Sequence, residues 1–144
     1  MNEQNNPETG RLATAALRVD IFSDVICPWC FIGKRRLEKA LNAWNGRSEH
    51  RITWRPFQLN PAIPRAGTDR AAYLDAKFGG SEARRAQEAR VAAVGRSEGI
   101  PFAFERIQRT PNTFDAHRLI WLGQNNDRQD EVVEGLFRGY FEDG

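Results

Sequence analysis

The chain has 144 residues, of which 40% are hydrophobic, 10% aromatic and 28% charged, the size and composition of one globular domain. This length excludes two independent catalytic domains, and the composition excludes a fibrous or wholly disordered protein. Lysine and arginine number 21 against 19 aspartate and glutamate residues, and the two signs are interleaved, so the composition gives no support to nucleic-acid binding.

The first 16 residues are polar and lack the basic start and the long apolar core of a secretion signal. We therefore expect residues 1–16 to be a disordered lead and the protein to be cytoplasmic. No run of about 18 apolar residues occurs, so the sequence predicts no membrane span. The chain has two cysteines, Cys27 and Cys30, too few for a disulfide-stapled secreted scaffold.

Residues 17–66 predict a strand, a helix and a second strand. Apolar and polar side chains alternate over Leu17–Phe22, the pattern of a half-buried strand. Pro28 suits the first position of a helix, and apolar residues then recur at helical spacing as far as Trp44. Alternation returns over Arg51–Arg55, and Pro56 should stop this second strand. The helix also carries basic side chains that we expect on a solvated face: Lys34, Arg35 and Arg36.

Residues 67–144 change to a helical pattern. An extended linker over Ile100–Arg109 divides the expected helices into two pairs. With approximate ends, these helices run over Thr68–Phe78, Ser81–Ser97, Thr110–Gln124 and Asp127–Phe141. The second helix has small side chains that we expect to pack closely against a neighbour: Ala83, Ala86, Ala89 and Ala93.

The segment Cys27-Pro28-Trp29-Cys30 follows a predicted strand and opens a predicted helix, the setting of a thioredoxin-like redox site. One helical turn brings the two sulfurs within disulfide reach. The free N–H groups and the dipole at the helix N-terminus stabilise a thiolate, so we predict Cys27 as the nucleophile. Cys30, one turn inside the helix, should resolve the mixed disulfide.

A zinc site is the alternative interpretation of this cysteine pair. It would need two further ligands, and only His50, His117 or carboxylates remain to supply them. The strand, the proline and the helix around the pair favour redox chemistry, so we expect no metal.

Three neighbours of the pair receive more modest roles. Trp29 should be partly exposed, where its ring can contact a substrate. Asp24 is expected to be a turn carboxylate rather than a proton relay. His117 shares a helical face with Phe114 and Trp121 and is expected to be a packed, hydrogen-bonded residue rather than a catalyst.

Three ordered segments resemble the DsbA-like thioredoxin family, with the best match to its FrnE-like branch of dithiol-disulfide oxidoreductases and isomerases: Val19–Gly33, Trp54–Pro61 and Thr110–Leu119. The resemblance implies an α/β, thioredoxin-like fold with a helical domain inserted after the second strand. Residues 17–66 would then be the first part of the thioredoxin-like domain, and residues 67–144 the insertion.

Members of this family continue into a further strand pair and a final helix, and this chain stops at Gly144 before them. We therefore expect a C-terminally incomplete domain whose first strand has an open edge, which favours self-association or a homodimer. The resemblance also implies that Asn112 faces the active site from the helical domain. The alternative for Asn112 is a cap of the following helix, and the two roles are compatible.

The predicted function is thiol-disulfide exchange between the Cys27–Cys30 pair and protein thiols or disulfides, with no bound cofactor and with glutathione as a redox partner. One alternative is glutathione-dependent isomerisation or transfer, as in 2-hydroxychromene-2-carboxylate isomerases and kappa-class glutathione transferases, which are similar but have serine at the position of Cys27. The other alternative is an inactive, truncated interaction module.

Overall fold

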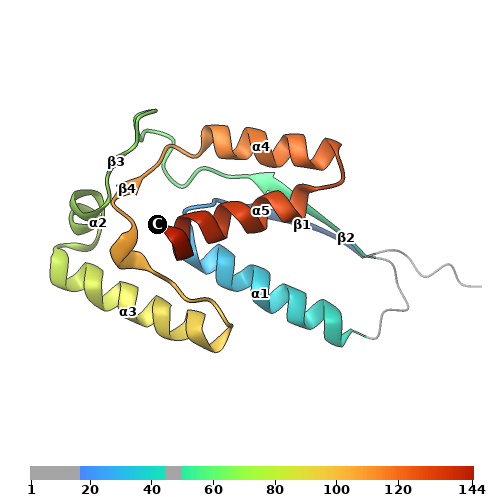
Figure 1. The fold of residues 1–144 in the computed structure, drawn as a ribbon, viewed down its shortest axis with the longest axis horizontal. Helices are drawn as coiled ribbons and strands as arrows, with labels where there is room; N and C mark the ends of the chain where they lie inside the picture. The colour runs from blue at the N-terminus through green and yellow to red at the C-terminus, as the bar shows by residue number, and fades with distance from the viewer. Residues whose placement is uncertain (1–16, 45–49) are drawn as a thin grey trace, which may run out of the picture.

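The computed structural model describes residues 17–44 and 50–144, so the predicted lead over residues 1–16 lies outside the described part. Figure 1 shows α1 and α5 running side by side in front of the strands β1 and β2, with α2 and α3 at one end. The elements in chain order are β1 (Leu17–Ser23), α1 (Pro28–Ala43), β2 (His50–Pro56), β3 (Thr68–Asp69), α2 (Arg70–Phe78), α3 (Ser81–Ser97), η1 (Phe104–Arg106), β4 (Arg109–Thr110), α4 (Phe114–Asn125), α5 (Gln129–Arg138) and η2 (Gly139–Asp143).

The predicted strand, helix and second strand are present, and they form a parallel βαβ unit. β1 pairs with β2 in parallel register from Leu17 opposite His50 to Ser23 opposite Pro56. Pro56 is thus the last residue of β2, where a residue without an N–H group is tolerated. The connection through α1 places the start of that helix at the carboxyl end of β1.

The first helix after this unit begins later than predicted. Thr68 and Asp69 form a short antiparallel pair with Arg109 and Thr110, so they are strand rather than helix. The Asp69 carboxylate accepts the N–H of Ala72 over 2.8 Å and caps α2 in place of Thr68. The segment predicted as an extended linker therefore holds a strand, β4, and also the 3₁₀ turn η1.

The remaining helices agree in place with the prediction and differ at their ends. α3 has the predicted bounds, whereas α4 begins at Phe114, after the segment predicted to open it. α5 begins at Gln129, and the chain continues from it as one π-helical turn, η2. Each described helix is too short or too polar to cross a lipid bilayer.

The core is a cluster of stacked aromatic rings that joins α1, α5 and the η1 segment. Phe31 of α1 stacks on Phe137 of α5 with ring centroids 4.9 Å apart, and Phe102 stacks on Phe104 at the same separation. Phe141 contacts both pairs. The helix that carries the cysteine pair is therefore anchored at its first turn by residues from the C-terminal third of the chain.

The predicted close packing of the alanines of α3 is wrong. Ala86, Ala89 and Ala93 are exposed, and Ala83 is only half-buried. The buried residues of α3 are Val91 and Gly95. A Cβ atom on Gly95 would lie 2.4 Å from ring carbons of Phe102, so glycine is what lets α3 approach the aromatic cluster.

The free edge of β1 leads to a prediction about self-association. In the described part of the chain β1 pairs with β2 alone, and Phe22 at its end is 69% exposed. An unpaired apolar strand edge is a template for pairing with another chain. We expect the 144-residue chain to self-associate as its concentration rises, and Phe22→Lys to shift it toward monomer in sedimentation velocity. Trp44→Lys is the control, because Trp44 is also exposed but follows the C-terminal end of α1 and is not part of a strand. Equal sedimentation of Phe22→Lys and the parent chain would contradict the prediction.

Candidate active site

Cys27 lies at the junction of β1 and α1. The strand ends at Ser23, and the next residues form a turn in which the Cys27 N–H donates to the Asp24 carbonyl over 3.0 Å. Cys27 is the N-cap of α1, and its carbonyl accepts the N–H of Cys30 over 3.1 Å. The cysteine pair thus occupies the first turn of the helix, where unpaired backbone N–H groups and the helix dipole favour negative charge.

The two cysteines are free thiols with half-buried side chains. A hydrogen bond between the thiols lowers the pKa of Cys30 to about 6 and raises the pKa of Cys27. Because one proton serves both sulfurs, the pair loses its first proton more easily than an ordinary thiol.

Other groups decide which sulfur carries the charge. Backbone N–H groups of Trp29 and Cys30 lower the pKa of Cys27. On Cys30, the Ser23 hydroxyl and the Asp24 N–H lower the pKa, while the Asp24 carboxylate raises it. Charge on Cys27 meets helix N–H donors without a facing carboxylate, so we keep the prediction that Cys27 carries the reactive thiolate.

Alkylation tests this assignment. We expect iodoacetamide to label Cys27 of the reduced protein before Cys30 at pH 6 to 7, because the reactive form is the thiolate. Peptide mass spectrometry of samples quenched in time would give both rates. In urea the two rates should become equal, and faster labelling of Cys30 in the folded protein would reverse the assignment.

Asp24 is a turn residue, as predicted, and its carboxylate is buried. One carboxylate oxygen, Oδ2, accepts the N–H of Leu59 over 2.7 Å and so ties the loop after β2 to the cysteine turn. The other oxygen, Oδ1, lies 3.4 Å from Nε2 of His117 on α4. Oδ1 of Asp24 and Nε2 of His117 make no hydrogen bond within the described residues. His117 is buried as expected, whereas Phe114 and Trp121 of the same helix are exposed.

A cavity of about 390 Å³ opens beside Cys27. Pro28 and Trp29 line it at the start of α1, and Trp29 is 48% exposed, which confirms the expected partial exposure. The opposite wall comes from α2, α3, η1 and η2, with the apolar side chains Leu74, Phe78, Val91, Phe104 and Phe141. Cys27 therefore borders a small apolar cavity rather than a flat surface.

Polar groups of this cavity escaped the sequence analysis. Arg70, Thr110 and Tyr140 line it, and Arg70 donates to Glu88 over 2.6 Å. These residues come from separate elements, so no local spacing relates them.

Asn112 lies in the turn before α4. Its Oδ1 accepts the N–H of Phe114 over 2.9 Å, and its Nδ2 donates to the Ile63 carbonyl over 2.7 Å. Asn112 thus hydrogen-bonds both the start of α4 and the loop after β2. It does not line the cavity beside Cys27. Its role in catalysis stays a prediction.

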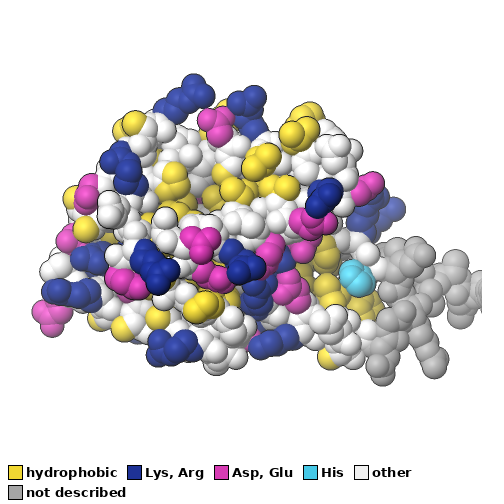
Figure 2. Space-filling model, viewed as in Figure 1, with side chains coloured by type: hydrophobic (Ala, Val, Ile, Leu, Met, Phe, Trp, Pro, Cys, Tyr) yellow, Lys and Arg dark blue, Asp and Glu magenta, His cyan; other side chains and the backbone are white. Residues whose placement is uncertain are grey.

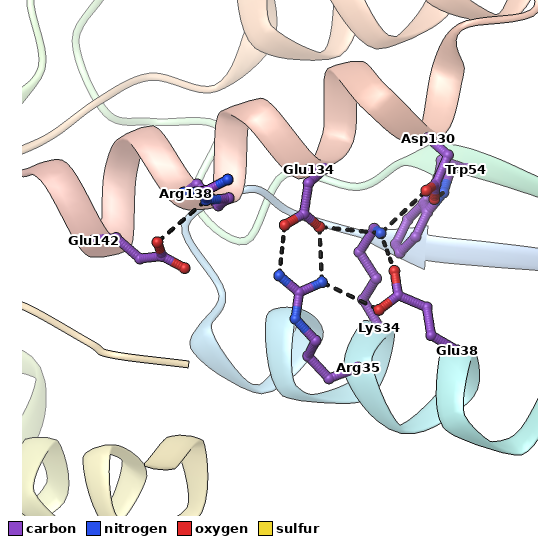
Figure 3. A network of polar contacts seen from close by, with 8 residues as sticks. All are labelled: Lys34, Arg35, Glu38, Trp54, Asp130, Glu134, Arg138 and Glu142. Carbon is purple, nitrogen blue, oxygen red and sulfur yellow. Dashed lines mark hydrogen bonds and ion pairs between the residues drawn. The ribbon is translucent and has the colours of Figure 1, made fainter. Parts of the chain in front are cut away.

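The basic residues of α1 do not form the predicted solvated face. Lys34 is buried, with its side chain 2% exposed, and pairs with Glu38, Asp130 and Glu134. Figure 3 shows this network between α1 and α5. Arg36 alone of the three is largely exposed, and it pairs with Glu98.

A family comparison agrees with this geometry. The model of the DSBA-like thioredoxin domain matches residues 18–144. The chain belongs to this family. The match includes the cysteine pair, both strands of the βαβ unit and every later helix, and it confirms the predicted α/β, thioredoxin-like fold.

Two similar proteins extend the comparison. The crystal structure of a probable DsbA oxidoreductase from Streptomyces coelicolor superposes with a TM-score of 0.79 and 34% sequence identity, over 88% of this chain. The uncharacterized protein YwbO of Bacillus subtilis is 33% identical over 46 residues, which are 32% of this chain and 21% of YwbO. This DSBA-like chain spans 54% of the Streptomyces chain, about half its length.

Proposed function

We propose that this protein is a thiol-disulfide oxidoreductase of the FrnE-like branch that uses the Cys27–Cys30 pair. The observation that carries the proposal is the position of Cys27, which caps α1, shares a hydrogen bond with Cys30 and borders a cavity. The DsbA-like family and the Streptomyces neighbour support redox chemistry in general. The proposal places the protein in the cytoplasm, with protein thiols and glutathione as its redox partners and no bound cofactor.

The reaction follows from the two sulfurs. The Cys27 thiolate attacks one sulfur of a substrate disulfide, so a Cys27–substrate bond forms, the substrate S–S bond breaks, and the leaving sulfur takes the electron pair and then a proton. Cys30 then loses its proton and attacks Cys27, which releases the second substrate sulfur as a thiolate. Two electrons have passed to the substrate, and the protein holds a Cys27–Cys30 disulfide. The same steps in reverse oxidise a substrate dithiol.

Asp24 and the helix start assist different steps in this scheme. Backbone N–H groups at the start of α1 stabilise Cys27 when it leaves or attacks as a thiolate. The Asp24 carboxylate opposes charge on Cys30, whereas the Cys27 thiol, the Ser23 hydroxyl and the Asp24 N–H favour it. In the proposed scheme Cys27 attacks first, and Cys30 acts once the mixed disulfide has formed.

Redox equilibration with glutathione tests the proposal. At ratios of reduced to oxidised glutathione that span the cytosolic range, mass spectrometry should find a two-electron loss confined to the peptide with Cys27 and Cys30. The protein should also speed the reduction of insulin by dithiothreitol. A pair that stays reduced under strongly oxidising glutathione and an insulin rate equal to the blank would overturn the proposal.

The second candidate function is glutathione-dependent isomerisation or transfer. It is favoured by the apolar cavity of about 390 Å³ beside Cys27, which suits a small organic substrate better than a folded protein. Turnover of an aromatic substrate that requires glutathione and persists in Cys30→Ser would support this candidate, because isomerisation needs no resolving cysteine.

A further inference from the structure

A buried hydroxyl without a partner lies in the wall of the cavity beside Cys27. Thr110 is 3% exposed, and its Oγ1 has no hydrogen bond to any described residue. A buried hydroxyl that loses water without gaining a partner is destabilising. Such groups in folded proteins are usually satisfied by water or by a ligand, and this one lies on a cavity wall.

Two further donors line the same cavity near Thr110. Burial raises the pKa of the Tyr140 hydroxyl, and the neighbouring Arg70 and Thr110 moderate that rise. Tyr140 therefore stays protonated and can donate. The Arg70 guanidinium donates from Nη1 to Glu88 over 2.6 Å and lies over the Phe104 ring. Thr110, Tyr140 and Arg70 come from β4, η2 and α2, so the fold itself brings them together.

We propose that this cavity binds a neutral small thiol or disulfide that has an apolar body and a carbonyl oxygen, with the carbonyl accepting from Thr110 and Tyr140. The inference rests on the proposed thiol-disulfide function and adds the substrate class to it. The ligand sulfur meets Cys27 at one side of the cavity, and the carbonyl meets the donors on the wall.

The size and walls of the cavity favour a small ligand. A volume of about 390 Å³ lies at the lower end of the range for small-molecule pockets. Aromatic and aliphatic side chains form most of the wall, including Trp29, Phe78 and Phe104. An apolar body in this space gains burial, whereas a strongly hydrated one loses its water without replacement.

The charges around the cavity favour a neutral carbonyl over a carboxylate. The Arg70 charge is matched by Glu88, which also lines the cavity, and Arg84 pairs with Glu88 and Asp75. This cluster of two cations and two anions has no excess positive charge. A ligand carboxylate that accepted from Thr110 and Tyr140 would be desolvated beside Glu88, which is unfavourable, and the other lysine or arginine of the lining, Lys77, lies over the Phe78 ring.

Binding to a chain that cannot exchange disulfides tests the site by itself. In Cys27→Ser we expect N-[2-(methylthio)ethyl]benzamide, a neutral amide with a thioether, to bind in isothermal titration calorimetry. Thr110→Val and Tyr140→Phe, each added to Cys27→Ser, should weaken this binding about fivefold to tenfold by removing a hydrogen bond. Thr53→Val on β2 is the matched control and should change the Kd less than twofold. Should Thr110→Val fail to fold, as judged by circular dichroism, Tyr140→Phe decides the result.

Exchange kinetics with matched disulfides test the substrate class. In the chain with both native cysteines, N,N′-dibenzoylcystamine should react with Cys27 about tenfold faster than either of two comparison disulfides. Bis(4-phenylbutyl) disulfide lacks the carbonyl, and 5,5′-dithiodivalerate has a carboxylate. Thr110→Val should remove most of the rate difference between N,N′-dibenzoylcystamine and bis(4-phenylbutyl) disulfide. If no disulfide reacts at Cys27, the proposed function fails. If exchange proceeds without this preference, and the Kd of the amide is the same in the Thr110→Val and Tyr140→Phe variants, the inference alone is overturned.

Discussion

Replacing Cys27 by serine should lower the rate of disulfide exchange by about a thousandfold or more, because a serine hydroxyl does not ionise near neutral pH and forms no disulfide. Cys27 is the residue at the cap of α1 and on the cavity wall, so it is the sulfur that a substrate reaches. The measurement is the initial rate of insulin reduction by dithiothreitol, with equal amounts of folded protein. The Cys27→Ser chain should also form no adduct with oxidised glutathione.

Cys30→Ser should give a different result from Cys27→Ser. The first attack still occurs in this variant, but the mixed disulfide is no longer resolved from inside the protein. We expect a stable adduct of glutathione on Cys27, seen by mass spectrometry and lost on addition of dithiothreitol. An adduct that accumulates on Cys30 in Cys27→Ser instead would exchange the two roles and contradict the order of steps proposed above.

Local signals were enough to place the cysteine pair. Alternation over β1, Pro28 at the helix start and the spacing of the cysteines all lie within the 14 residues Leu17–Cys30, and each was correctly interpreted as part of one strand–helix junction. The ends of α2 and α4 were less well predicted, because β3 and β4 use the residues before them for a sheet contact between Thr68 and Thr110. A pairing over that separation leaves no periodic signal in either segment.

The surroundings of the site depend on contacts between distant segments. The Asp24–His117 contact and the approach of Thr110 and Tyr140 to the cavity join elements that have no common sequence pattern. Asp24 was expected in a turn, and it lies in one, but the identity of its partner required the position of α4. The family and the place of the cysteine pair were therefore predictable, and the wall of the cavity beside Cys27 was not.

Lys34 shows why a charged residue on a predicted helix is hard to place. Its neighbours on α1 suggested a solvated face, yet α5 covers this side of the helix and supplies Asp130 and Glu134. Figure 2 shows how closely opposite charges are interleaved on the face seen there, viewed as in Figure 1. Lys34 keeps its charge by pairing with Asp130 and Glu134 at 3.1 Å each and with Glu38. Its ammonium contacts all three carboxylates, and Arg35 is the second cation beside Glu38 and Glu134 (Figure 3).

The stability of this network should depend on acid pH. Arg35 first, and Lys34 after it, lowers the pKa of Glu134 from 4.5 to about 2. Since the folded-state pKa is the lower one, the stabilisation is fully present above about pH 4.5 and is lost as the pH falls toward 2. Lys34 stays charged throughout this range, because its partners raise its pKa above 10.5.

Lys34→Met should therefore destabilise the protein by about 2–4 kcal/mol at pH 7, because it keeps the buried aliphatic chain but removes the cation that pairs with Asp130 and that Glu38 and Glu134 share with Arg35. Glu38 and Asp130 are partly exposed, 40% and 64% at their side chains, which keeps the loss below that of a fully buried network. Urea unfolding followed by circular dichroism would measure it. Lys39→Met is the matched control on the same helix, since Lys39 is 60% exposed and a solvent-exposed pair such as that with Glu98 adds little to stability. The difference in free energy of unfolding between the Lys34→Met chain and the parent should shrink as the pH falls from about 4.5 toward 2. A difference smaller than that of Lys39→Met at pH 7, or one that grows in acid, would show that the Lys34 ammonium does not stabilise the network.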